Sequence, residues 1–86
     1  MIRKWMVDAR KVRGWSIPQA AKNSDVSASI WRYYEAGKDK TGMSRMTMNL
    51  IAVGLRMDSR TVEKKEREFF WAREQEKYKE RLKDKT

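Results

Sequence analysis

The residues that start and stop helices divide the first half of this chain into short segments. Gly14 and Gly37 suit the left-handed position at which helices often end. Ser16 and Ser27 can each cap the first turn of the next helix with a side-chain hydroxyl, and Pro18 costs little in such a turn. The chain has one proline and four glycines in 86 residues, with no linker-like run. The sequence therefore predicts short helices joined by tight turns.

Apolar residues recur at helical spacing between these signals. The predicted helices cover about Ile2 to Arg13, Ser16 to Ser24, Ser27 to Ala36 and Ser44 to Arg56, with a turn at Asp25 and Val26. The side chains that we expect to face the core are Met6, Ala9, Trp15, Ile30, Trp31, Tyr34, Met46, Leu50, Ile51, Ala52 and Leu55. Ala20 and Ala21 are small enough to let a neighbouring helix approach closely.

A charged segment follows, from about Ser59 to Lys83. Opposite charges recur there at separations of three or four residues, a pattern that supports an exposed helix. Its apolar residues are too few and too irregular for a long coiled-coil seam. Two interpretations stay open, because the segment could dock on the body through Phe69, Phe70 and Trp71 or could act as a dimerisation arm.

The net charge of +9 is unevenly distributed along the chain. Residues 1–60 hold twelve Lys or Arg against five acidic residues, whereas residues 61–86 hold nine against seven. An excess of +7 in one small unit attracts polyanions and predicts salt-sensitive binding to phosphates. The alternative is a cationic surface that only keeps the protein in solution.

Several classes of function are disfavoured by composition. The chain has no cysteine and no histidine, so it lacks thiolate nucleophiles, disulfides, the commonest general base and the commonest metal ligands. We therefore expect no enzyme activity, no metal and no other cofactor. The longest apolar run is far shorter than a membrane span, and no signal-peptide pattern is present, so we expect a cytoplasmic protein.

Two short helices joined by a tight turn match the geometry of a helix-turn-helix, whose second helix enters the major groove of DNA. The residues that strengthen this match are Arg10, Gly14, Trp15, Ser16, Ala20, Ala21, Val26, Ser27, Trp31, Glu35, Gly37, Ile51, Ala52 and Leu55. At this spacing, about residues 6–57 of the chain resemble the Cro/repressor type helix-turn-helix family of phage and bacterial DNA-binding regulators.

The resemblance implies an all-α fold, namely a compact five-helix repressor-like domain with a long charged C-terminal helix. Residues 1–58 would form the DNA-binding domain and residues 59–86 the charged helical extension. Arg10 and Glu35 would form a partly buried ion pair. The residues implied to reach bases are Ala28, Ser29, Arg32 and Tyr33. Those implied to meet phosphates are Ser27, Lys38, Lys40, Thr41 and Arg45.

The chain departs from the family pattern at two positions. Ile17 stands where a phosphate-holding glutamine is common, and Asp25 replaces the usual glycine of the turn. The resemblance otherwise implies a regulator, most simply a repressor, that binds double-stranded DNA as a homodimer on half-sites about 34 Å apart. The alternatives are a protein-interaction module, such as an antitoxin or phage accessory factor that uses the C-terminal helix, and a non-specific DNA-binding protein.

Overall fold

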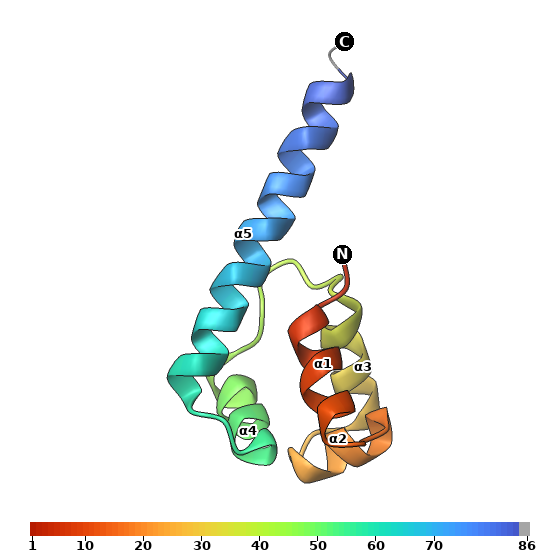
Figure 1. Ribbon diagram of the computed structural model, residues 1–86, viewed down its shortest axis with the longest axis vertical. Helices are drawn as coiled ribbons and strands as arrows, with labels where there is room; N and C mark the ends of the chain where they lie inside the picture. Colours follow the sequence, from red (N-terminus) through yellow and green to blue (C-terminus); the bar gives the residue numbers. More distant parts are fainter. Residues whose placement is uncertain (85–86) are drawn as a thin grey trace.

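The computed structural model of the chain describes residues 1–84 and contains five α-helices in that range (Figure 1). They are α1 (Lys4–Val12), α2 (Ile17–Asn23), α3 (Ala28–Ala36), α4 (Arg45–Leu55) and α5 (Ser59–Asp84). The predicted all-α class is confirmed, and the fifth helix is the long charged one. The last two residues of the predicted extension 59–86 lie outside the described part of the chain.

Local signals set the helix ends. Ser16, Ser27 and Ser44 precede α2, α3 and α4, and each hydroxyl accepts a hydrogen bond from the backbone N–H three residues later. These bonds satisfy amides that have no partner inside the helix. Gly37 ends α3 at φ +72°, and Gly14 has the same φ in the turn after α1. These caps and turns follow from the sequence pattern alone.

The core lies between the first four helices and centres on Trp31, which is fully buried together with Met6, Ile51 and Leu55. Two of the expected core residues were wrong. Ile30 is 42% exposed and Met46 is 73% exposed. Successive residues of a helix are about 100° apart, so a helix that buries Trp31 turns its neighbour Ile30 toward solvent. The buried side of α4 likewise carries Ile51, Ala52 and Leu55, and Met46 lies on the other side.

α2 and α4 approach each other closely because one residue has no side chain. A Cβ atom at Gly54 would lie 2.7 Å from the backbone oxygen of Asn23 and would also collide with Ser24. Ala20 and Ala21 are buried on α2. Small residues on both helices therefore fix the position of α2 against the core.

Only the C-terminal half of α5 forms an extension that is separate from the body of the other helices. Val62, Glu66, Phe69 and Arg73 are buried against the body, whereas the C-terminal half of the helix extends away from the other helices (Figure 1). The docking role expected for Trp71 was wrong, since its side chain is 68% exposed. Two residues beyond Phe69, it lies about 200° around the helix and only borders a surface hollow that the loop after α3 and α4 also line.

A buried charge cluster, which the sequence did not indicate, fastens α5 to the body. The guanidinium of Arg3 is fully buried and forms paired hydrogen bonds with Asp39 (2.7 and 3.1 Å) and with Glu66 (2.6 and 2.9 Å). It also donates to the carbonyl of Tyr34 and lies 4.4 Å from the centre of the Phe69 ring. The cluster joins the N-terminal segment, the loop after α3 and the first half of α5.

Arg73 adds a second attachment. Its guanidinium donates to the carbonyls of Gly37 (3.2 Å) and Asp39 (2.6 Å) and lies 4.5 Å from the centre of the Phe70 ring. The predicted boundary at residue 58 therefore marks the start of a helix whose first four turns pack on the body. Among residues 1–84, no helix combines the length and the apolar character needed to cross a membrane.

Candidate nucleic-acid interface

The exposed side of α3 is the surface to which the family resemblance assigned base contacts. Ser29, Arg32 and Tyr33 are exposed there, as expected for residues that reach a ligand. Ala28 is half-buried and packs partly against the core, so only part of its methyl group is available. Ile30 stands on the exposed side as well. It was missed because its apolar character placed it with the core residues.

An ion pair on the buried side of α3 holds this helix in place. The Arg10 guanidinium donates two hydrogen bonds of 2.8 Å to the carboxylate of Glu35, as the resemblance implied. The indole N–H of Trp31 donates to the same carboxylate at 2.6 Å. Burial alone would raise the pKa of Glu35, but the hydrogen bonds from Arg10 and Trp31 lower it below its usual value. The carboxylate is therefore charged at neutral pH and fixes α3 against α1.

The turn between α2 and α3 adopts the conformation expected of a glycine although it contains an aspartate. Asp25 has φ +54°, in the left-handed region that asparagine and aspartate tolerate better than most residues. The next amide, from Val26, donates to the carbonyl of Ala21 at 3.0 Å. α3 is capped by Ser27 and not by Asp25. The replacement of glycine thus preserves the turn and places an exposed carboxylate beside α3.

The residues assigned to phosphate contacts do not form one cluster. Ser27 caps the N-terminal end of α3, and Lys38 and Lys40 follow its C-terminal end. The two lysines share a surface hollow with Glu76, Lys77 and Glu80 of α5, so α5 contributes charges of both signs there. Asp39, between them, turns inward to Arg3.

Thr41 and Arg45 are also exposed, at the loop and at the first residue of α4. Arg45 lies 3.3 Å from a carboxylate oxygen of Glu63, with 75% of its side chain exposed. An ion pair this exposed is weak, so the guanidinium can exchange Glu63 for another anion. Arg45 therefore remains able to meet a phosphate.

The positive charge of the front half lies at the surface. Within residues 1–60, Arg3 and Arg10 are held in internal ion pairs, and so are Asp39 and Glu35. Ten of the twelve basic residues remain against three of the five acidic ones. The excess of +7 is thus carried by residues outside these pairs.

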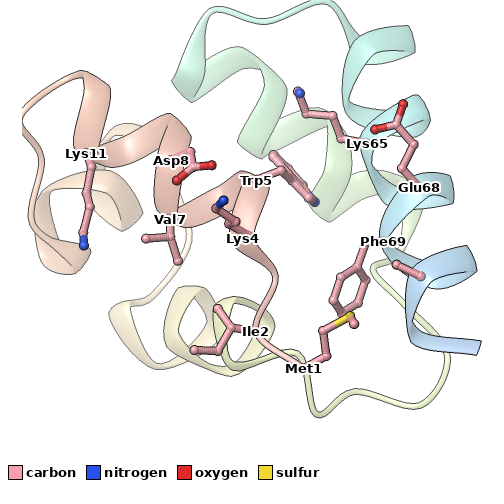
Figure 2. Close-up of a pocket in the computed structure, with 11 residues that line it drawn as sticks. Met1, Ile2, Lys4, Trp5, Val7, Asp8, Lys11, Lys65, Glu68 and Phe69 are labelled. Atoms are coloured by element: carbon pink, nitrogen blue, oxygen red, sulfur yellow. The ribbon is translucent and has the colours of Figure 1, made fainter. Parts of the chain in front are cut away.

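A second surface feature is a groove of about 740 Å³ between α1 and α5 (Figure 2). Met1, Ile2, Val7 and Phe69 contribute apolar side chains to it, together with the half-buried Trp5. The indole N–H of Trp5 donates to Glu66 at 2.8 Å, which ties this wall of the groove to the buried cluster. Its other lining residues are Lys4, Asp8, Lys11, Lys65, Glu68 and Ala72. No local pattern predicts this groove, because its two walls lie more than fifty residues apart in the chain.

Comparisons with protein-family models, with curated proteins and with solved structures found no match to this chain. The similarity to the Cro/repressor type family therefore rests on the residue pattern and stays a prediction.

Proposed function

We propose that this protein is a transcription regulator that binds double-stranded DNA and inserts α3 into the major groove. The observation that carries the proposal is the exposed side of α3, where Ser29, Ile30, Arg32 and Tyr33 project from a short helix held by the Arg10–Glu35 ion pair. A helix that enters the major groove needs such a rigid mounting, because base edges are read through hydrogen bonds with strict geometry.

The side chains on this surface supply complementary kinds of base contact. The Arg32 guanidinium can donate two parallel hydrogen bonds to O6 and N7 of guanine. Ile30, and in part Ala28, can contact the methyl group of thymine. The hydroxyls of Ser29 and Tyr33 can bond either a base or a phosphate. Together these residues favour a short site that contains both a G·C and an A·T pair.

The surface charge supports binding to the DNA backbone. The +7 excess of residues 1–60 favours association with phosphates and the release of counterions. Bound over a promoter, a protein of this size would act most simply by occlusion, as a repressor. The family pattern of phage and bacterial regulators agrees with this role.

The test is selection of bound sequences from a random duplex library, followed by titration of the recovered duplex at several salt concentrations. We expect one short recovered sequence and an affinity that falls steeply as salt rises. Arg32→Ala should lose about 5- to 150-fold in affinity for that sequence, equivalent to 1–3 kcal/mol, and should relax the preference at one position. Arg67→Ala, which removes an exposed arginine of α5, is the matched control.

Three results would count against sequence-specific regulation. A salt-independent affinity would exclude the phosphate contacts. Equal binding of random and selected duplexes would favour a non-specific DNA-binding protein. An Arg32→Ala loss no greater than that of Arg67→Ala would exclude α3 as the reading element.

The second candidate is a protein-interaction module, and the apolar groove of Figure 2 favours it. Ala72 of α5 lines this groove, whereas Ile2 also shares a smaller hollow with Arg32 of α3. Ala72→Glu should leave the DNA affinity of a regulator unchanged within about twofold, whereas a protein-interaction module would bind no duplex. Removal of residues 74–86 tests the C-terminal part of α5 as a partner-binding element and keeps the buried Phe69 and Arg73 in place.

A further inference from the structure

The C-terminal half of α5 has an exposed apolar stripe, of which only Trp71 borders the body, at a hollow shared with Met43 and Met48. Trp71, Gln75, Tyr78 and Leu82 are separated by four, three and four residues, which places them on one side of the helix. The three apolar members are all exposed. At about 100° per residue, this outer stripe lies on the side of α5 opposite the buried residues Val62, Glu66, Phe69 and Arg73. The body therefore leaves the stripe accessible.

We propose that a second copy of this chain covers the outer stripe, with the two α5 helices paired in antiparallel orientation. Trp71 then packs beside Leu82 of the second copy, and Gln75 beside its Tyr78. This register brings Glu74, on one flank of the stripe, next to Arg81 of the second copy. The two-fold symmetry repeats the contact, so the pair is closed by two Glu74–Arg81 ion pairs. Both residues are exposed, and the contact of Glu74 to Lys77 of its own helix is long, at 3.8 Å.

Charge favours this orientation over a parallel one. Lys64 and Glu68 continue the line of the stripe toward the body, so parallel helices would set each of them against its own like charge in the second copy. Parallel helices would also place two bodies, each with an excess of +7, side by side. In the antiparallel pair, residue 59 lies about 26 Å from the midpoint of the pairing, so the two helix starts are about 50 Å apart. That separation is several Debye lengths at ordinary ionic strength.

The interface is small, since each copy contributes three apolar side chains. Stable dimers bury far more surface, so we expect a reversible dimer that forms at high protein concentration. The consequence for DNA rests on the proposed function, whereas the pairing itself does not. Two α3 helices at opposite ends of such a dimer would bridge separate sites and would not fit half-sites about 34 Å apart.

The test is sedimentation equilibrium of the full chain without DNA, with Glu74→Arg and Arg81→Glu variants. Each variant alone creates two like-charge contacts, so we expect at least a tenfold loss of self-association. Mixed in equal amounts, the two variants regain both ion pairs, and association should return to the wild-type level. Glu74→Arg also removes a weak contact to Lys77 (3.8 Å), so Lys77→Ala is the control for that loss. Far-UV circular dichroism of each variant verifies the fold.

The outcomes decide the proposal. Wild-type protein that remains monomeric up to millimolar concentration would overturn it, and so would a mixture that stays as dissociated as its components. A parallel pair would place Glu74 opposite Lys79 of the second copy. Self-association that survives Arg81→Glu and is lost in Lys79→Glu would therefore reject the antiparallel register. Because DNA is absent, none of these outcomes depends on the function of α3.

Discussion

Replacement of Arg3 by alanine should be one of the most damaging single changes in this protein. The substitution removes a fully buried cation and leaves the carboxylates of Asp39 and Glu66 buried without it. Four hydrogen bonds to carboxylates and one to the carbonyl of Tyr34 are lost with it. Breaking a buried ion pair from one side costs about 3–5 kcal/mol, because the remaining charge is uncompensated.

This cost is large for a chain of 86 residues, since domains of this kind are stable by only about 5–15 kcal/mol. One kcal/mol corresponds to about 4–8 °C in Tm for a domain of this size, so Arg3→Ala should lower Tm by more than about 10 °C. Thermal and urea unfolding, followed by circular dichroism, measure the change. Tryptophan fluorescence should also report the loss, because Trp5 is hydrogen bonded to Glu66.

Two controls make this prediction sharp. Arg45→Ala removes an exposed arginine 3.3 Å from Glu63 and should cost at most about 1 kcal/mol. The double variant Arg3→Met and Glu66→Gln removes one buried charge of each sign and leaves Asp39 in electrostatic contact with Arg73, so it should recover part of the loss. An Arg3→Ala cost no greater than that of Arg45→Ala, or a double variant less stable than Arg3→Ala, would refute a role for these buried charges in stability.

Three further predictions concern acid stability, helix packing and base contact. The pKa values of Glu35 and Asp39 are lowered in the fold, because hydrogen bonds from arginine outweigh the effect of burial. The stability that these two carboxylates contribute is therefore complete above about pH 5 and is lost as pH falls below about 4. Urea midpoints that stay constant from about pH 6 to about pH 3 would contradict this. Gly54→Ala should destabilise the fold by about 1–3 kcal/mol, because its Cβ would collide with backbone atoms at the end of α2. Ser24→Ala should be neutral or stabilising, because the buried Ser24 hydroxyl has no hydrogen-bond partner. Equal effects of the two variants in chemical denaturation would refute the close packing of α2 against α4. Ile30→Ala should change Tm by less than about 4 °C, because the side chain is exposed, yet it should weaken binding to a selected duplex severalfold. A large loss of stability with unchanged affinity would instead show that Ile30 is a core residue.

The sequence by itself determined the helix ends and the turn. Each capping serine accepts a hydrogen bond from the amide three residues later, and Gly37 ends α3 by adopting a left-handed backbone conformation. Such interactions depend on neighbours in the chain and so can be predicted from local pattern. The Arg10–Glu35 pair, 25 residues apart, came from the family resemblance and not from the pattern itself.

Tertiary structure alone decided how α5 is attached and which apolar residues face solvent. Arg3 meets Asp39 and Glu66 across 36 and 63 positions, and no local pattern marks an arginine near the N-terminus as buried. Ile30 and Trp71 look like core residues in sequence but are exposed, because adjacent helix positions differ by about 100° and packing selects only one side. Burial depends on what another element covers, and that partner is specified far away in the chain.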